Sequence, residues 1–129
     1  MAERSADWIK QAQRDLEMAK KARESGFYEW TCFIAQQAAE KAVKAVYQAQ
    51  GGAAMGHGIG TLIRGLEGRV HPPGEIIRSA RMLDGYYIPS RYPDGMAEGS
   101  PADHFDVEDA DGAIRSAGEI VRFCKNLLA

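Results

Sequence analysis

Hydrophobic residues recur at helical spacing from the start of the chain. Intervals of four, four and three residues place the first set in a single stripe along one helix face. This stripe consists of Trp8, Ala12, Leu16 and Ala19. We expect Ser5 to act as the N-cap of this first helix and Ser25-Gly26 to end it.

A second helix is predicted from about Phe27 to Gln50, ahead of the glycine pair at 51–52. Its apolar arc is rich in alanine, which predicts that a neighbouring helix approaches closely. The members of this arc are Ile34, Ala35, Ala38, Ala39, Ala42, Ala45 and Val46. The opposite arc carries Trp30, Phe33, Gln37, Glu40, Lys41 and Lys44. Because two large rings begin this otherwise polar arc, we expect a dimer or partner interface at Trp30, Phe33, Gln37 and Lys41.

Glycine and proline divide the rest of the chain. Eight of the 14 glycines lie within residues 51–74, so a broken connection with one short helix, at about 59–66, is expected there. A further helix should begin near Gly74, and its inward stripe is Ile76, Ala80, Leu83 and Tyr87. Prolines 89, 93 and 101 indicate a loop over 89–103, after which Asp106 should cap a helix that runs to the end.

These patterns predict an all-α fold: a four- to five-helix up-and-down bundle with a short extra helix and a proline-rich loop before the last helix. The chain of 129 residues, 45% hydrophobic and 26% charged, is typical of one globular domain over residues 1–129. A net charge of -2 argues against unaided binding of duplex DNA. Without an apolar run long enough for a bilayer, we expect a cytoplasmic protein with no membrane contact. Cys32 and Cys124 lie in apolar patterns and are interpreted as buried, reduced thiols.

Residues 94–111 contain seven acidic side chains and no Lys or Arg. Four of them stand at the start of the last predicted helix, where the helix dipole favours negative charge. This local interpretation competes with an acidic strip that docks a partner.

The histidines offer few sites for chemistry. His57 lies in Gly56-His-Gly-Ile-Gly60, but the segment follows a helix and lacks the Gly-Lys-Ser/Thr of a phosphate loop. His57 is therefore expected to bond backbone or a neighbouring helix, with a general-base or ligand role as the alternative. Since His57, His71 and His104 show no metal-ligand spacing, we expect neither a metal nor a cofactor.

The segment from Ala80 to Asp94 is the strongest candidate for ligand contact. Arg91 lies between Pro89 and Pro93 in a restricted loop, where its guanidinium could hold a phosphate while tyrosine rings stack on a base. The residues assigned to this nucleotide or RNA contact are Arg81, Asp84, Tyr87, Arg91 and Tyr92. In the alternative, Arg91 folds back on Asp84 or on helix-end carbonyls and pins the loop.

Four motifs resemble the higher eukaryotes and prokaryotes nucleotide-binding (HEPN) family, in its small stand-alone prokaryotic form. They are Trp8-Ile-Lys-Gln-Ala12 with Asp15-Leu16, the run from Tyr28 to Ala45, Gly56-His57, and the block from Leu83 to Asp94. The resemblance covers nearly the whole chain. It implies an all-α bundle, usually dimeric and often encoded beside a minimal nucleotidyltransferase as a toxin–antitoxin pair.

Many members of the family are metal-independent ribonucleases, whose motif is Arg, four to six residues, then His. This chain departs from that motif, because twelve residues separate Arg91 from His104, the next histidine. Arg64 does precede His71 by the right interval, but glycines and prolines interrupt that segment. We therefore expect a nucleotide- or RNA-contacting dimer without efficient chemistry, paired with a nucleotidyltransferase antitoxin. The alternatives are an active ribonuclease toxin that uses Arg91 with His57 or His104, and a purely structural interaction module.

Overall fold

The computed structural model describes residues 3–52, 54–66 and 68–129, and these ranges contain helices and no β-strand. The elements are α1 (Ser5–Glu24), α2 (Tyr28–Ala49), α3 (Ile59–Arg64), α4 (Gly74–Asp84), the 3-10 turn η1 (Pro93–Gly95), α5 (Pro101–His104) and α6 (Val107–Leu128). The predicted all-α fold is confirmed. None of the helices in the described ranges has both the length and the apolar character needed to span a membrane.

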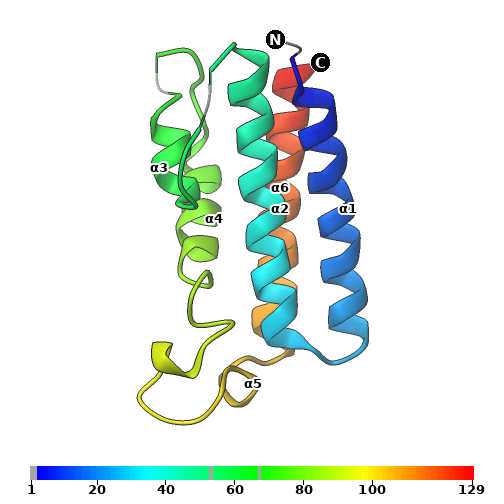
Figure 1. Cartoon of the computed structure of the whole chain (residues 1–129), viewed down its shortest axis with the longest axis vertical. Coiled ribbons are helices and arrows are strands. Elements are labelled where there is room, and N and C mark those ends of the chain that lie inside the picture. Colours follow the sequence, from blue (N-terminus) through cyan, green and yellow to red (C-terminus); the bar gives the residue numbers. More distant parts are fainter. Residues whose placement is uncertain (1–2, 53, 67) are drawn as a thin grey trace.

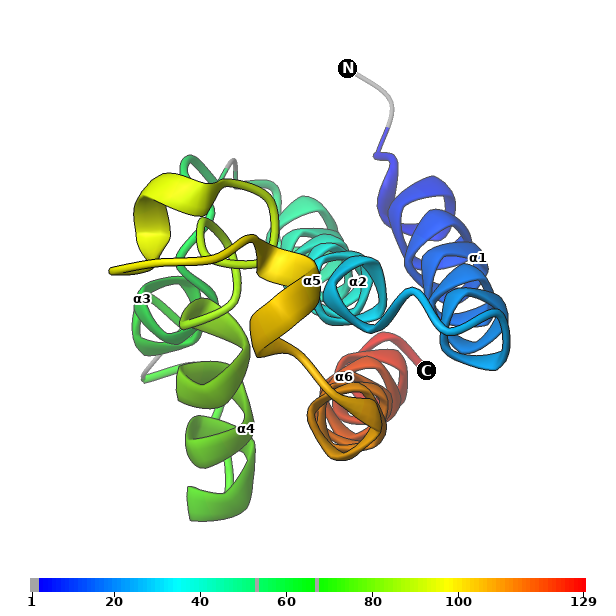
Figure 2. The same ribbon diagram turned by 90° about the horizontal axis from the view of Figure 1, so that it is seen from below.

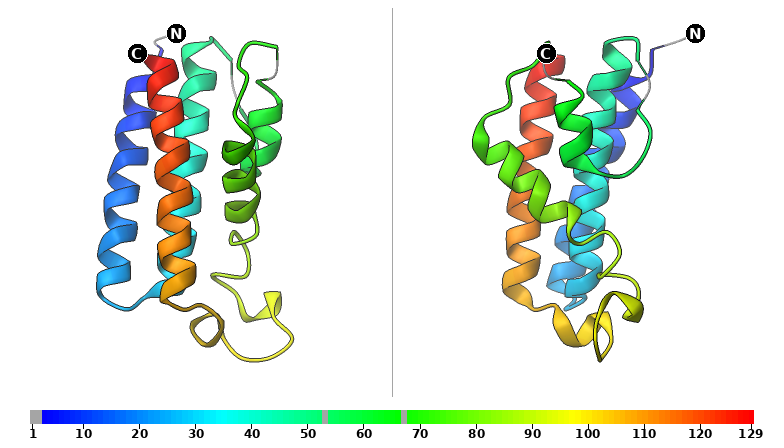
Figure 3. Two further views of the ribbon diagram at one scale, coloured as in Figure 1. Left: turned by 180° about the vertical axis from the view of Figure 1, so that it is seen from behind. Right: turned by 90° about the vertical axis from the view of Figure 1, so that its left-hand side faces the viewer.

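Three long helices, α1, α2 and α6, lie side by side and form the main body of the bundle (Figure 1). The shorter α4 packs against α6 and is inclined to the long helices, and α3 bridges α4 and α2 (Figure 3). Seen from below, α5 lies by the end of α2 at which that helix begins (Figure 2). The chain thus brings α3, α4 and the loop after α4 beside one flank of α2.

The alanines of α2 form the centre of the core, as their pattern predicted. Ala35, Ala38, Ala39, Ala42 and Ala45 are all fully buried, and both α1 and α6 pack closely on them. Alanine side chains permit this packing because the distance between helix axes depends on the size of the side chains at the contact. The core thereby holds α2 in place, and the flank of α2 that faces away from α1 and α6 remains free to contact α3, α4 and the loop after α4.

The two cysteines are buried and reduced, as predicted. Cys32 lies on α2 and Cys124 on α6, and neither is in a disulfide. Burial raises the pKa of each thiol to about 12, so both are protonated at neutral pH.

Most predicted helix limits agree with the structure to within one or two residues, but one cap is wrong. Ser5 is the first helical residue, and the residue before it, Arg4, makes no side-chain capping bond. Gly26 ends the α1 turn with a positive φ of 82°, a conformation that glycine adopts without strain. Asp106 accepts the Asp109 amide at the start of α6, so the predicted cap there is confirmed.

The predicted loop at 89–103 is not wholly irregular, because it contains η1 and the start of α5. Pro101 occupies the first turn of α5, and Ser100 and Asp103 form a reciprocal capping box. A second capping box joins Asp106 to Asp109. These local bonds use several of the acidic side chains of residues 94–111, in agreement with the local interpretation of that stretch.

Tyr87 is the second correction. The pattern placed it in the inward stripe of α4, but that helix ends at Asp84 with Gly85 as its C-cap. Tyr87 is half-buried, whereas Ile76, Ala80 and Leu83 are buried in the core. Beyond the end of α4 the backbone turns, and the Tyr87 ring faces the flank of α2 instead.

Candidate functional site

Aromatic rings from three segments meet beside the first half of α2. Trp30 and Phe33 come from α2, with ring centroids 6.1 Å apart in an edge-to-face arrangement. The Tyr87 ring lies 6.1 Å from that of Phe33, and the His57 imidazole stacks on Tyr87 at 4.6 Å. We call these rings, together with Tyr92, the aromatic cluster.

Arg91 inserts its guanidinium among these rings. Its central carbon lies 4.5 Å from the ring centroids of Phe33 and Tyr87 and 4.9 Å from that of Tyr92. The rings attract the cation through their negative faces. Arg91 Nε also donates to the Tyr87 carbonyl oxygen at 3.0 Å, which is one of the bonds expected of a loop-pinning residue.

The bond that pins the loop involves only Nε of Arg91 and not the two terminal nitrogens of the guanidinium. Within the described ranges, the two terminal nitrogens of Arg91 have no hydrogen-bond or ion-pair partner in the chain. The side chain is partly exposed, and Tyr92 beside it is 49% exposed. Arg91 therefore keeps donors that can reach an oxyanion while its position is held by the rings and the carbonyl.

His57 is held by a carboxylate that the sequence patterns did not single out as a site residue. Its Nδ1 lies 3.0 Å and 3.2 Å from the two carboxylate oxygens of Glu40, which is buried on α2. Lys44 Nζ at 3.0 Å and Gln36 Nε2 at 3.3 Å complete the surroundings of that carboxylate. Gln36 Nε2 also donates to the His57 carbonyl oxygen at 3.0 Å, which ties the segment before α3 to α2.

The contact with Glu40 determines which nitrogen of the His57 imidazole carries the proton and which can accept one. A carboxylate only accepts, so Nδ1 carries a proton and Nε2 of the neutral ring keeps its lone pair. The His57 side chain is 53% exposed, so solvent or a ligand can approach the ring. The signal for Glu40 in the sequence was its place on the polar arc of the second helix, but nothing local indicated that His57 would meet it.

Asp84 and Arg81, which were also predicted to contact a ligand, lie outside the aromatic cluster. Asp84 accepts the backbone amides of Ile59 at 2.7 Å and Gly60 at 3.0 Å, so it caps the start of α3. Arg81 is exposed on α4, and no hydrogen bond, ion pair or ring contact joins it to the aromatic cluster within the described ranges. Of the five residues predicted to contact a ligand, Tyr87, Arg91 and Tyr92 come together.

The two candidate histidines are in different surroundings. His57 shares the Tyr87 ring with Arg91, whereas His104 lies exposed on α5 with its Nε2 at the Glu98 carbonyl oxygen. His104 makes no ring contact with the aromatic cluster in the part of the chain that is described. The fold thus links His57 to Arg91 through the Tyr87 ring, without the spacing of the family motif.

The residues predicted to form a dimer or partner interface make several contacts within the chain itself. Tyr87 and Arg91 cover one side of Phe33, while Trp30 remains 47% exposed. Gln37 donates to Gln36 Oε1 at 2.8 Å, and Lys41 bonds Asp15 on α1. Contact of these residues with a partner stays a prediction.

Among the described residues, no three His, Cys, Asp or Glu side chains converge in an arrangement that could hold a metal ion. The groups that define the candidate site are therefore a cation, an imidazole with its carboxylate, and aromatic faces. This combination suits the recognition of a phosphate next to a planar base.

Comparison with known proteins gives matches along almost the entire chain. The model of the HEPN domain matches residues 5–127. A protein of Methanocaldococcus jannaschii with the name "Putative toxin MJ1304" is 26% identical over 130 residues, which cover 94% of this chain and 86% of that protein.

Solved structures show the same fold. TT1696 from Thermus thermophilus is 39% identical with a TM-score of 0.94, and the match covers 97% of this chain and 98% of that one. ST0689, described as an archaeal HEPN homologue, is 44% identical with a TM-score of 0.84 over 99% and 100% of the two chains. The HEPN domain protein tm0613 from Thermotoga maritima is 38% identical with a TM-score of 0.77, over 95% and 97%. The chain therefore belongs to the HEPN domain family.

Proposed function

We propose that this HEPN protein contacts a nucleotide, either free or within a single strand of RNA, through Arg91 and the aromatic cluster. The observation that carries the proposal is the Arg91 guanidinium, held among three rings while its terminal nitrogens have no partner in the described chain. A guanidinium fixed in this way loses little freedom when it donates to a phosphate. The exposed Tyr92 ring offers a face on which a base can stack.

The overall charge of the chain is compatible with such a local site. With a net charge of -2, the chain lacks the overall positive charge that is typical of unaided duplex binding. A single-stranded ligand needs less charge, because stacking on aromatic rings supplies part of its affinity. The site therefore favours unpaired nucleotides over duplex DNA.

Replacing Arg91 tests this proposal directly. We expect Arg91→Ala to weaken binding of adenosine monophosphate and of a short oligo(A) RNA by about 1–3 kcal/mol, or about 5- to 150-fold. Arg91→Lys should retain part of the affinity, since it keeps the charge but not the paired donors. Isothermal titration calorimetry measures each affinity, and Arg115→Ala, at an exposed arginine on α6, is the control. Unchanged affinity in a folded Arg91→Ala protein would remove Arg91 from the site.

A metal-independent ribonuclease is the second candidate, favoured by the shared contact of His57 and Arg91 with Tyr87. In this reaction His57 Nε2 takes the proton of a ribose 2′-hydroxyl, and the oxygen forms a bond to the adjacent phosphorus. The bond to the 5′-oxygen breaks, that oxygen takes a proton from water, and a 2′,3′-cyclic phosphate remains. Glu40 would act as the positioning residue that holds His57, and Arg91 would stabilise the charge on the phosphate oxygens.

Cleavage of a mixed RNA pool in EDTA decides between the two candidates. A ribonuclease should lose activity in both Arg91→Ala and His57→Ala, while His104→Ala serves as a matched histidine control. Glu40→Gln should also shift the pH profile of cleavage, which a merely structural role would not do. Absence of cleavage by the wild-type protein leaves binding as the function, and loss of cleavage in His104→Ala alone would exclude His57 as the base.

A toxin–antitoxin setting completes the proposal. A relative that is 26% identical is named as a toxin candidate, and the family resemblance implies a minimal nucleotidyltransferase as the antitoxin partner. Co-purification of the chain with any nucleotidyltransferase that is encoded next to it tests this pairing. If the two proteins do not associate, and induced expression of the chain alone leaves growth unaffected, the toxin–antitoxin setting is wrong.

A further inference from the structure

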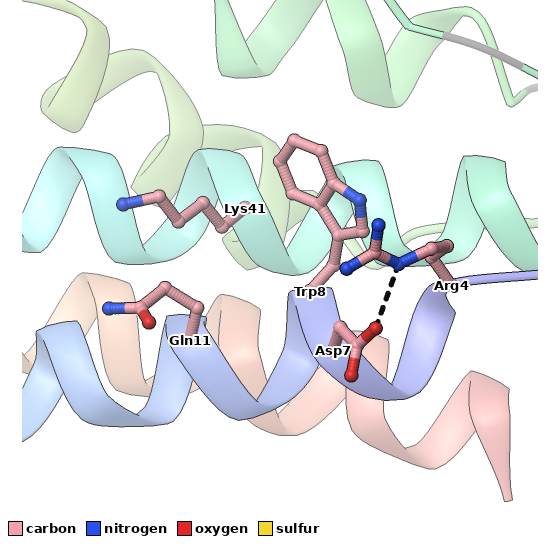
Figure 4. Close-up of a pocket in the computed structure, with 5 residues that line it drawn as sticks. All are labelled: Arg4, Asp7, Trp8, Gln11 and Lys41. Atoms are coloured by element: carbon pink, nitrogen blue, oxygen red, sulfur yellow. Dashed lines mark hydrogen bonds and ion pairs between the residues drawn. The ribbon is translucent and has the colours of Figure 1, made fainter.

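A pocket of about 410 Å³ lies where the first turns of α1 face the middle of α2. It is lined by Arg4, Asp7, Trp8, Gln11 and Lys41 (Figure 4). We propose that this pocket is a second subsite for single-stranded RNA, in which a base stacks on Trp8 and its phosphate contacts Arg4. This inference rests on the proposed contact at Arg91 and extends it into a longer binding surface.

Trp8 supplies the aromatic face of the subsite. Its indole rises from α1 toward α2 and lies between Lys41 and Arg4 (Figure 4). The pocket volume is within the range of small-molecule sites, and it is large enough for one base. Since every base has a π-face, stacking on an indole needs no particular sequence.

Arg4 is the cation best placed to change partners. Its Nε donates to Asp7 Oδ2 at 2.8 Å, and both side chains are about two-thirds exposed, at 65% and 64%. Exposed pairs of this kind contribute little stability, so the pair can open at small cost, with Asp7 turned to solvent and Arg4 free to contact a phosphate. Lys41 differs, because it bonds Asp15 and only 28% of its side chain is exposed, so it serves as a wall of the pocket.

The flank of α2 connects this pocket with the aromatic cluster. Phe33, Gln37 and Lys41 follow one another at intervals of four residues, so each lies about 40° around the helix from the one before. At a rise of about 1.5 Å per residue, the level of Lys41 is about 12 Å along α2 from that of Phe33. A strand of several nucleotides held at Arg91 can span this distance, whereas a mononucleotide cannot occupy both places.

The two tryptophans of the chain provide separate reporters for the two sites. Trp8→Phe leaves Trp30, which contacts Phe33 in the aromatic cluster, as the single tryptophan. Trp30→Phe leaves Trp8, which lines the pocket. We would titrate each variant with adenosine monophosphate and with an oligo(A) hexanucleotide, and follow the tryptophan emission.

We expect the hexanucleotide to quench both reporters. Trp8→Ala should weaken hexanucleotide binding by about 5- to 150-fold, the loss typical of one stacked base, and leave mononucleotide binding at Arg91 unchanged. Arg4→Ala should also weaken hexanucleotide binding. Arg14→Ala is the matched control, because Arg14 forms the same kind of exposed pair, with Glu17, at a spacing of three residues on α1.

The outcomes distinguish this inference from the proposed function. If the hexanucleotide quenches Trp30 and Arg91→Ala weakens its binding, but Trp8 emission stays constant, the subsite is wrong and the Arg91 contact stands. If the hexanucleotide quenches Trp8 while Arg91→Ala binds it as tightly as the wild type does, the proposed Arg91 contact is wrong. The continuous binding surface between the two sites is then wrong as well. Equal hexanucleotide affinity of Trp8→Ala and wild type also overturns the subsite. Trp8→Phe keeps an aromatic ring at this position, so it shows whether a loss of affinity in Trp8→Ala comes from the missing ring or from misfolding.

Discussion

At the scale of single residues, the arrangement of the site depends on Tyr87. Its ring contacts Phe33, His57 and the Arg91 guanidinium, and its carbonyl oxygen accepts the Arg91 Nε proton. Helical periodicity assigned Tyr87 to the core, because it follows Leu83 by four residues. Because α4 ends at Asp84, the last residue of the expected stripe lies beyond the helix and becomes part of the site.

Asp84 illustrates a residue whose observed contacts are structural. Its carboxylate accepts two backbone amides that have no partner within α3. We expect Asp84→Ala to lower the free energy of unfolding by about 1–2 kcal/mol, and Asp84→Asn by less, because an amide oxygen can still accept one of these protons. Urea denaturation followed by circular dichroism measures both, with Asp94→Ala, at an exposed aspartate of η1, as the control. An unchanged urea midpoint for Asp84→Ala would show that this cap contributes nothing.

At the scale of elements, the long helices and the six-residue α3 were predictable, whereas the four-residue α5 was not. α2 and α6 begin and end within a residue of their predicted limits, since many apolar residues at one spacing outweigh any single exception. α5 has only four residues and no apolar stripe that could be detected. Its formation depends on Pro101 in the first turn, a capping box, and packing against α2.

The contact between the end of α1 and the start of α6 predicts a pH dependence. Arg23 Nε donates to Asp111 at 2.8 Å, and this bond holds the carboxyl pKa of Asp111 below its ordinary value of 3.8. A carboxyl whose pKa is lower in the folded state stabilises the protein above that ordinary pKa, and the stabilisation is lost as the pH falls through the lowered value. We therefore expect the thermal midpoint of the wild type to fall more steeply below pH 3.8 than that of Asp111→Asn.

Thermal unfolding monitored at a series of acidic pH values measures this difference. Glu108→Gln is a suitable control, because it removes another carboxylate from the first turn of α6. Parallel curves for wild type and Asp111→Asn would show that the pair does not link α1 to α6 in solution.

At the scale of the whole molecule, exposed apolar side chains support the expected dimer. Met18 and Phe27 are each 55% exposed and Trp30 is 47% exposed, and all three line a second pocket, of about 450 Å³, on α1 and α2. Large exposed apolar groups that lie together are common at protein interfaces. The resemblance to HEPN proteins implies dimers as well, so the dimer remains our proposal.

We expect the mass in solution to be twice that of one chain, and Trp30→Glu to shift the protein toward monomers by placing a charge in the interface. Light scattering after size-exclusion chromatography measures the mass at several concentrations. Leu127→Glu, at an exposed apolar residue near the end of α6, is the matched control. A wild-type monomer that persists at micromolar concentration would contradict the dimer and the role given to Trp30.

The sequence by itself determined the helices, their buried faces and the family, because helical periodicity, caps and breaking residues act over a few neighbouring positions. It also indicated Arg91, since two prolines restrict the loop around it. Only the tertiary structure decided that Glu40 meets His57, that Asp84 caps α3, and that His57 and Arg91 share one ring. These contacts join segments 17 or more residues apart or depend on where α4 ends, so they follow from the packing of helices, which no local pattern specifies.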